Sequence, residues 1–195
     1  MVEIPRPSKK NIQEYLIKWD NLEDHYIWQE SSLDKLFHKT YKDNTDLNEI
    51  LIKCSCLNDF YSTNIFLIYP VAKNIYDLKI DDRLNKGDSS LINDIAHVTI
   101  NGVEKRFYSF ASKYCSHHNS INFPIYDYFV DKMLWYFQKK DKFSNFSKED
   151  LKDYVKFKNI LMDFKKFYDI DEYNLRDIDK YLWIAGKKYF PKKYK

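Results

Sequence analysis

The side chains best suited to chemistry lie in the central part of the chain. Lys105 and Lys113 follow an Asn101-Gly102 turn, and Asp127 follows Pro124 at the expected start of a helix. A lysine amine can act as a nucleophile when its surroundings favour the neutral form. A carboxylate at a helix N-terminus caps the helix and can stabilise nearby positive charge. These residue types indicate that the region could form an active site in which a lysine is the nucleophile and an aspartate stabilises positive charge.

The two lysines differ in their expected surroundings. Lys105 lies nearer the glycine turn, whereas Lys113 closes the segment Ser-Phe-Ala-Ser-Lys, whose apolar residues would perturb an amine more. We therefore prefer Lys113 as the nucleophile and keep Lys105 as the alternative. The simpler interpretations are a solvated lysine at position 113 and a plain helix cap at Asp127.

Several neighbouring residues are candidates for contact with nucleic acid. His117 and His118 could contact the phosphate backbone or a flipped base, and Tyr126 and Tyr128 could stack on a base. The alternatives are local hydrogen bonding for the histidines and core packing for the tyrosines. Asn101, Gly102, Lys105 and Arg106 are further candidates for contact with DNA.

The C-terminal residues 187–195 carry five lysines, among them Lys187 and Lys188, and no acid. Lysines that alternate with aromatic residues suit phosphate contact together with base stacking. The alternative is that this segment is a solvated tail without a binding role. The whole chain is only mildly basic, with a net charge of +3, so the tail alone does not decide between them.

Composition predicts a globular and mostly α-helical chain. Hydrophobic residues make up 44% and aromatic residues 18% of the 195 residues, which argues against disorder. Only three glycines are present, too few for the many turns of an all-β fold. The length suits one domain over residues 1–195, built as a multi-helix bundle.

Cysteine usage and hydropathy indicate a cytoplasmic protein without a cofactor. The three cysteines, Cys54, Cys56 and Cys115, have no zinc-ligand spacing and favour a reducing compartment. No metal is expected, and the scattered acids, Asp81 and Asp82 included, make metal-dependent hydrolysis a weaker alternative. No signal peptide or membrane segment is predicted.

Hydrophobic periodicity and capping residues predict nine or ten helices. The first contains Ile12, Tyr15 and Trp19, and a second contains Leu33 and Phe37. Capping residues predict later helix starts at Asp46 with Glu49, at Ser62 or Thr63, at Asp127, at Ser147 with Asp150, and at Asn174 with Asp177. The last of these helices is expected to end at Gly186.

Residues 94–114 allow two interpretations. We favour a helix, a tight turn at Asn101-Gly102 and a second helix from about Lys105 to Cys115. The alternative is a β-hairpin, with strands His97–Ile100 and Val103–Phe107, because Asn-Gly also closes hairpins. The segment Cys115–Phe123 is expected to be a polar connector.

The order of these segments resembles the helix-hairpin-helix DNA glycosylases, and more specifically their 8-oxoguanine glycosylase-like members. That family places a glycine-containing hairpin before a helix, then a polar connector, then a proline-containing turn whose aspartate heads the next helix. The matching residues are Asn101-Gly102-Val103, the helix from about Lys105, and Phe123-Pro-Ile-Tyr-Asp127. The resemblance covers about residues 45–140.

This resemblance implies an activity and roles for residues. The aspartate, here Asp127, would stabilise positive charge at C1′ of a flipped nucleotide as the base departs. The lysine would attack C1′ and form a Schiff base. Lys113 and Lys105 lie 14 and 22 residues before Asp127, spacings that bracket the one usual in the family. The expected function is therefore excision of a damaged or modified base from DNA.

The chain departs from the family pattern in one important respect. The family holds a DNA phosphate with a Leu-Pro-Gly-Val-Gly hairpin, of which only Gly102-Val103 is present. No four-cysteine cluster follows, which excludes the iron–sulfur type. A non-catalytic DNA-binding or protein-interaction module on the same scaffold, for example in restriction or phage defence, is the alternative function.

Overall fold

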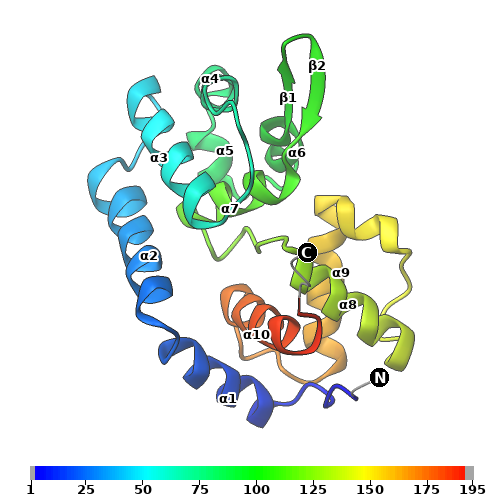
Figure 1. Ribbon diagram of the computed structural model, residues 1–195. Helices are drawn as coiled ribbons and strands as arrows, with labels where there is room; N and C mark the ends of the chain where they lie inside the picture. The colour runs from blue at the N-terminus through cyan, green and yellow to red at the C-terminus, as the bar shows by residue number, and fades with distance from the viewer. Residues whose placement is uncertain (1–2, 192–195) are drawn as a thin grey trace. The chain divides into compact units, whose positions relative to one another are not determined.

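The computed structural model describes residues 3–191 and divides the chain into two compact units (Figure 1). Unit 1 consists of Met1–Leu22 and Tyr126–Lys195, and unit 2 consists of Glu23–Ile125. The described residues form ten α-helices and one two-stranded sheet, which confirms the mostly helical class. The single domain expected over residues 1–195 stays a prediction.

Unit 1 is built around an aromatic core. Its elements are α1 (Lys9–Asp20), α8 (Tyr128–Asp141), a 3₁₀ helix η2 (Lys148–Lys152), α9 (Tyr154–Phe167) and α10 (Leu175–Tyr189). The ring of Phe164 on α9 packs 5.8 Å from Phe137 of α8 and 5.3 Å from Phe143, measured between ring centroids. All three rings are buried. The high aromatic content therefore supplies core packing in this unit.

The helix starts of unit 1 follow the expected caps, with two differences. Ser147 and Asp150 form a capping box, but it opens η2, and Asp153 caps α9 separately. Asn174 and Asp177 form the other expected box at the start of α10. This helix continues past Gly186 to Tyr189, which corrects the expected end.

The extension of α10 changes the interpretation of the C-terminal lysines. Lys187 and Lys188 lie in the last helical turn, where positive side chains interact favourably with the helix dipole. They are therefore not part of an irregular tail. Residues 192–195, the rest of the predicted basic segment, lie outside the described residues.

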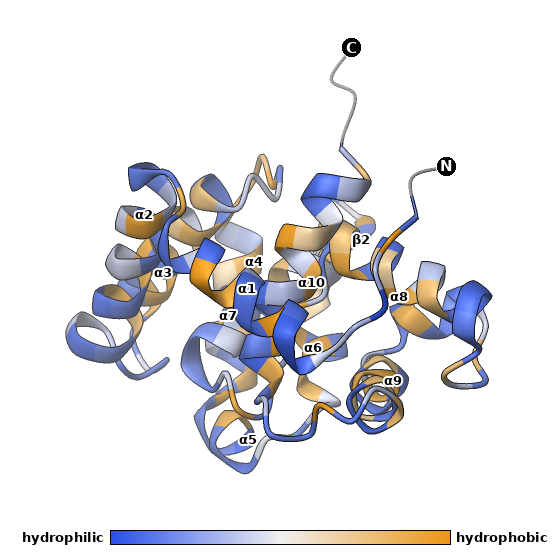
Figure 2. Cartoon of the chain, turned by 90° about the horizontal axis from the view of Figure 1, so that it is seen from below, coloured by the Kyte–Doolittle hydropathy of each residue, from blue (hydrophilic) through white to orange (hydrophobic). Residues whose placement is uncertain are grey.

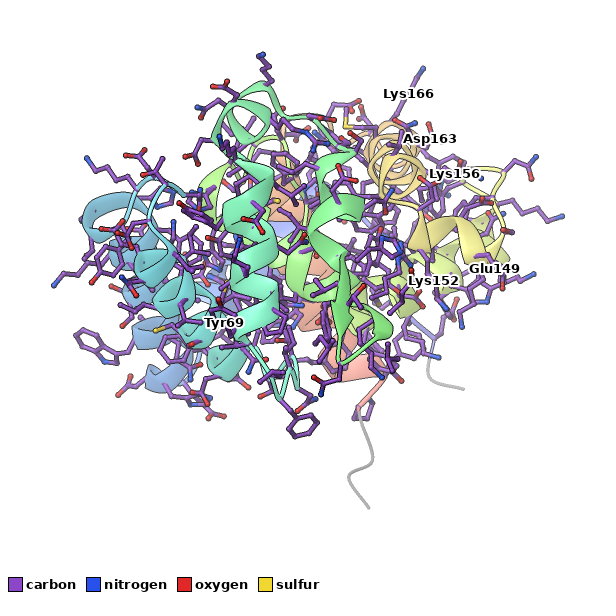
Figure 3. The ribbon with its side chains drawn as sticks, turned by 90° about the horizontal axis from the view of Figure 1, so that it is seen from above. Tyr69, Glu149, Lys152, Lys156, Asp163 and Lys166 are labelled. Carbon is purple, nitrogen blue, oxygen red and sulfur yellow. The ribbon has the colours of Figure 1, made fainter. Side chains whose placement is uncertain are left out.

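Helix α9 shows how these helices separate a buried face from a polar one. Phe157, Ile160 and Phe164 are buried, whereas Lys156, Asp163 and Lys166 are exposed. The three exposed side chains point away from α9 in Figure 3. Apolar and polar residues also alternate along the other helices (Figure 2). This is the period of about 3.6 residues that identified the helices in the sequence.

Gly186 permits the close approach of α10 to α8. A Cβ atom at this position would lie 2.6 Å from Cβ and 3.0 Å from the backbone O of Phe129. Because backbone cannot move aside cheaply, we expect Gly186→Ala to lower the free energy of unfolding by about 1–3 kcal/mol. Urea unfolding followed by circular dichroism measures this loss.

Gly102→Ala is the control for that substitution. A Cβ at Gly102 meets nothing within 4 Å, so only its positive φ of 77° would be strained, at a cost of about 1 kcal/mol. Equal stability of Gly186→Ala and the wild type would contradict the close packing of α8 and α10.

Unit 2 contains the remaining elements. They are α2 (Asp24–Lys35), a π-helical turn η1 (Leu36–Thr40), α3 (Leu47–Phe60), α4 (Tyr69–Leu78), α5 (Asp81–Lys86), α6 (Leu91–Ala96), β1 (His97–Ile100), β2 (Val103–Arg106) and α7 (Tyr108–His118). Helix α7 contacts α3, α6 and η1. Its residues 110–117 are all buried, so α7 is central to the packing of this unit.

In unit 2, the predicted start of α3 is confirmed, and the predicted start of α4 is wrong. Asp46 caps α3 by accepting hydrogen bonds from the backbone N–H groups of Asn48 and Glu49. The helix expected to begin at Ser62 or Thr63 begins instead at Tyr69. Ser62 and the nearby Asn64 have positive φ values of 48° and 59°, which interrupt the helical path.

The segment around Asn101-Gly102 is a β-hairpin, which corrects the preferred helical interpretation. β1 and β2 pair antiparallel, with Ile100 opposite Val103 on either side of the turn. Asn101 and Gly102 both have positive φ, 51° and 77°, as a two-residue hairpin turn requires. Lys105 therefore belongs to a strand and not to the following helix.

Helix α7 is longer at its C-terminal end than expected. The predicted polar connector was to begin at Cys115, but the helix continues to His118. Cys115 and His117 are buried, with exposed fractions of 0% and 7%. The two histidines therefore lie on a packed helix and not in a loop, because their helical neighbours fill the core of unit 2.

Candidate functional site

The preferred nucleophile Lys113 lies on a buried face of α7. Its side chain is only 3% exposed, and its Nζ donates a hydrogen bond of 2.5 Å to Oγ of Ser109, one helical turn earlier. Nζ also lies 5.2 Å from the ring centroid of Tyr61, at the C-terminal end of α3. A cation over an aromatic face is stabilised electrostatically, so Tyr61 favours the ammonium form of Lys113.

His117 lies one turn after Lys113 and contacts the same tyrosine. Its Nε2 is 3.0 Å from the hydroxyl of Tyr61, and that hydroxyl is 3.4 Å from Oε2 of Glu30 on α2. Lys113, His117, Tyr61 and Glu30 thus form one titratable cluster within unit 2. The sequence pattern did not indicate Tyr61 or Glu30, because they come from helices distant in the chain.

The hairpin presents the other candidate residues of unit 2 at the surface. Every residue from Asn101 to Arg106 is exposed. The guanidinium of Arg106 lies 4.5 Å from the ring centroid of Tyr108, and its Nη2 donates to Oδ1 of Asn93 at 3.5 Å. The exposure of Lys105 contrasts with the burial of Lys113, so of these two candidates Lys113 has the desolvated setting that a nucleophilic amine needs.

The candidates after residue 125 belong to unit 1. Asp127 is the N-cap of α8, as predicted, and its Oδ1 accepts a hydrogen bond of 2.9 Å from the backbone N–H of Phe129. Tyr126 donates to Oδ2 of Asp131 at 3.0 Å. Tyr128 is 43% exposed and has Nζ of Lys132 at 5.4 Å from its ring centroid. Tyr128 therefore offers more free ring surface for stacking than Tyr126.

The two helical lysines at the end of α10 both lie over aromatic rings. Nζ of Lys187 is 4.4 Å from the ring centroid of Trp183, and Nζ of Lys188 is 5.0 Å from that of Tyr189. The predicted alternation of charge and aromatic surface is thus present on this helix. These lysines and Asp127 lie in unit 1, whereas Lys113 and the hairpin lie in unit 2.

A second cluster surrounds Lys53 of α3, which the sequence analysis did not single out. The side chain is fully buried, and Nζ donates to the backbone O of Asp43 at 2.8 Å and to Oδ1 of Asn44 at 2.7 Å. Nζ is also 3.5 Å from Nε2 of His118. Burial, which opposes the charged form, lowers the pKa of Lys53 to about 8.

Asn44 is the hub of this cluster. Its backbone N–H and its Nδ2 donate to the two carboxylate oxygens of Asp81, at 2.9 Å and 2.6 Å. Its Oδ1 accepts from Lys53 and also from the hydroxyl of Tyr114 at 2.6 Å. Asn44 therefore links a buried cation to a carboxylate that the cation does not contact directly, and it satisfies every polar group between them.

His118 ends α7 beside Lys53. Burial and the neighbouring positive charge of Lys53 hold the pKa of His118 well below its usual value, so the imidazole stays neutral. Because an ammonium group can only donate, a hydrogen bond from Lys53 to Nε2 requires the tautomer with the ring proton on Nδ1. His118 thus differs from His117, which contacts Tyr61, although the two residues are adjacent in the sequence.

The pKa of Lys53 predicts a specific dependence of stability on pH. Between about pH 8 and 10.5, the unfolded chain holds the Lys53 proton and the folded chain releases it. Unfolding therefore takes up a proton, and stability rises with pH through this window. The free energy of unfolding increases by on the order of 3 kcal/mol over this window, which corresponds to the full lowering of the Lys53 pKa. Below pH 8 both states are protonated and the contribution is constant.

The comparison with Lys53→Met isolates this effect, because the titration of tyrosines and cysteines is common to both proteins. We expect the stability of the wild type, relative to the variant, to increase from pH 8 to pH 10.5 in urea unfolding experiments. A difference that stays constant over this range would show that Lys53 is not perturbed.

The described residues carry no metal-binding cluster and no membrane span. Among residues 3–191, no group of three or more His, Cys, Asp or Glu side chains is placed to hold a metal ion. None of the described helices combines the length and hydrophobicity needed to cross a membrane. Cys54, Cys56 and Cys115 are free, and burial raises the pKa of the Cys54 and Cys115 thiols.

Comparison with known proteins shows the family to which the chain belongs. An uncharacterized protein of Haemophilus influenzae is 52% identical over 151 residues, which are 77% of this chain and 72% of that protein. No solved structure matches the chain. Residues 11–122 match the family HI_0787_N, described as an N-terminal domain. The chain belongs to the HI_0787_N family.

Proposed function

We propose that the chain binds DNA and excises a damaged or modified base in the manner of a helix-hairpin-helix glycosylase. The observation that carries this proposal is the burial of the Lys113 side chain on α7. This helix directly follows the exposed hairpin in the chain. A buried amine is the form of lysine expected for a nucleophile that attacks a flipped nucleotide, and the exposed hairpin is a surface that could contact DNA.

The proposed reaction begins with the neutral amine of Lys113. The amine attacks C1′, the N–C1′ bond forms, and the bond from C1′ to the base breaks. The electron pair of that bond leaves with the base, which takes up a proton. Opening of the sugar ring then gives a Schiff base between Lys113 and C1′. β-Elimination from this Schiff base expels the 3′-phosphate, and hydrolysis of the C=N bond by water, with or without that elimination, frees Lys113 and releases the DNA.

Two further groups of residues have roles in this proposal. Asp127 would stabilise positive charge that develops on the sugar, since its side chain is fixed as the cap of α8. Lys105 and Arg106 on the hairpin, with Asn101 and Gly102 at its tip, would contact the phosphate backbone. On α10, Lys187 and Lys188 would add further phosphate contacts.

Borohydride trapping tests the proposal. The purified protein is incubated with duplex oligonucleotides that contain oxidised, alkylated, deaminated or abasic sites, in the presence of borohydride. Reduction of a Schiff base would leave a stable protein–DNA adduct of increased mass. We expect an adduct with at least one of these substrates, whereas no adduct and no released base with any of them would reject glycosylase-lyase chemistry.

A non-catalytic DNA-binding module is the second candidate. The ring of Tyr61 favours the charged form of Lys113, and an ammonium group binds phosphate but cannot attack C1′. This candidate predicts that DNA is retained, that retention falls with rising salt, and that neither adduct nor free base appears. Loss of DNA binding altogether would reject both candidates.

A further inference from the structure

A polar pocket of about 190 Å³ lies in unit 2 and contains His118. His118 and Lys113 are five residues apart on α7, so at 3.6 residues per turn they lie on different faces of that helix. The pocket is therefore separate from the cluster around Lys113 and Tyr61. A cavity of about 150 Å³ holds benzene, so this pocket has room for a ligand of six or more heavy atoms.

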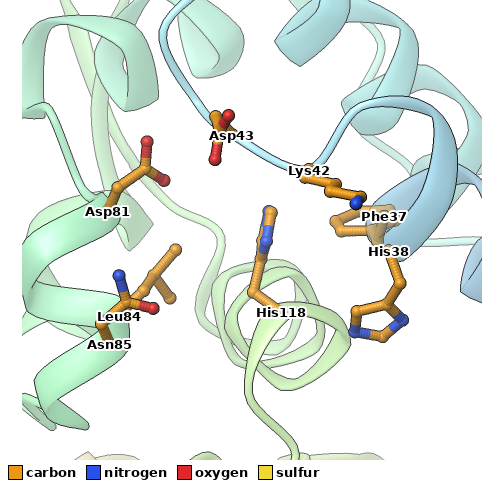
Figure 4. Close-up of a pocket in the computed structure, with 8 residues that line it drawn as sticks. All are labelled: Phe37, His38, Lys42, Asp43, Asp81, Leu84, Asn85 and His118. Carbon is orange, nitrogen blue, oxygen red and sulfur yellow. The ribbon is translucent and has the colours of Figure 1, made fainter.

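Three segments of unit 2 line the pocket (Figure 4). The segment that follows α2 contributes Phe37, His38, Lys42 and Asp43. Helix α5 contributes Asp81, Leu84 and Asn85, on the opposite side of His118 in the figure. The side chains of Asp43 and Asp81 extend toward the space beside the imidazole, so the pocket offers hydrogen-bond acceptors as well as donors.

The charges around the pocket balance. Asp43 and Asp81 are acids of the lining, Lys42 is its lysine, and Lys53 supplies a second positive charge behind His118. An anion alone would face two carboxylates, and a cation alone would face two ammonium groups. A ligand without net charge, carrying separate positive and negative groups, matches this arrangement best.

His118 supplies a directed donor for the negative group. Since Nε2 faces Lys53, the Nδ1–H is the free donor of the ring. Among residues 3–191, the only buried side-chain N or O atom without a partner is Oε1 of Gln138. Nδ1 of His118 therefore reaches solvent-accessible space, and the pocket is the space that His118 lines.

The apolar walls contribute little contact area. Phe37 is 1% exposed and Leu84 is 3% exposed, so neither offers a flat face on which a planar heterocycle could stack. The polar lining residues, the exposed His38 included, therefore supply most of the contacts for a ligand. The Asn44 network fixes the carboxylate of Asp81 and the position of Lys53 before a ligand arrives, which reduces the cost of ordering on binding.

We infer that this pocket binds a small zwitterion, of the class of free α-amino acids. The ammonium group of the ligand lies between Asp43 and Asp81, and its carboxylate accepts hydrogen bonds from His118 and Lys42. Asn85, an exposed residue of the lining, is available to a polar side chain of the ligand. This binding is independent of DNA and of the proposed excision chemistry, so each can fail without the other.

Ligand-observed NMR on the full chain without DNA tests the inference. L-Serine and the other proteinogenic L-amino acids are titrated, together with N-acetylated forms that lack the ammonium group and methyl amides that lack the carboxylate. We expect saturable binding of at least one free amino acid, and binding of its two blocked forms weaker by about tenfold or more, since each lacks one charge-assisted contact.

Variants locate the site. Asp43 is exposed, and within residues 3–191 its carboxylate accepts no hydrogen bond, so Asp43→Asn should fold normally and weaken binding by about tenfold or more. Asp82→Asn changes a neighbouring exposed acid outside the pocket and should bind as the wild type does. Three results would overturn the inference: no saturable binding, equal binding of an N-acetylated form, or preferential binding of inorganic phosphate or a free nucleobase.

Discussion

Asn44→Ala is expected to destabilise unit 2 by about 3–5 kcal/mol, a large share of the stability of an ordinary domain. The substitution removes the acceptor of both Lys53 and the Tyr114 hydroxyl, and the side-chain donor to Asp81, while the backbone N–H at position 44 can still donate to Asp81. A fully buried ammonium group would then have lost one of its two close acceptors and the side-chain amide that joins it to Asp81. Leaving such a group uncompensated costs more than an ordinary hydrogen bond contributes.

Hydrogen exchange in α3 and α7 measures this loss within unit 2, and urea unfolding measures it for the whole chain. Asn48→Ala is the matched control, because Asn48 is an exposed asparagine near the start of α3 and should change stability by less than about 0.5 kcal/mol. If Asn44→Ala lowers the free energy of unfolding by less than about 1 kcal/mol, water must replace the hydrogen bonds of the Asn44 side chain.

Lys113→Ala is expected to abolish the borohydride adduct and to reduce base release by about a thousandfold. The proposed Schiff base requires a primary amine at this position, and alanine supplies none. Gel electrophoresis of trapped protein–DNA complexes and quantification of the free base measure the two effects. Lys113→Arg retains the positive charge without a primary amine, so it should bind DNA and form no adduct.

The matched control is Lys105→Ala, which removes a lysine from the exposed hairpin. We expect this variant to keep the adduct and to weaken DNA binding in a salt-dependent manner. Asp127→Asn should slow base release while leaving the adduct detectable on abasic DNA. An adduct that persists in Lys113→Ala but disappears in Lys105→Ala would reverse the assignment of the nucleophile.

Local signals in the sequence were reliable where a few neighbouring residues decide the structure. The caps at Asp46, Asp127 and Asn174 open helices as expected, because each side chain bonds to a backbone N–H only two or three residues away. The capping box at Ser147 was also present. What followed it was a short 3₁₀ helix, since Asp153 begins α9 separately.

Two local predictions were wrong where the signal was ambiguous. Asn-Gly suits both a helical turn and a hairpin, and the contact of β1 with α4 accompanies the hairpin in the folded unit. Ser62 was a plausible cap, but the left-handed backbone at Ser62 and Asn64 delays α4 to Tyr69.

By itself the sequence determined the helical class, most helix starts and the position of Lys113 on an apolar segment, because these depend on composition, periodicity and neighbouring residues. Only the tertiary structure brought Lys53 to Asn44, His118 and, through Asn44, to Asp81. These residues span positions 44 to 118, and no spacing in the sequence encodes their contacts. The burial of Lys53 decides its perturbed pKa, and burial is a property of the packed unit.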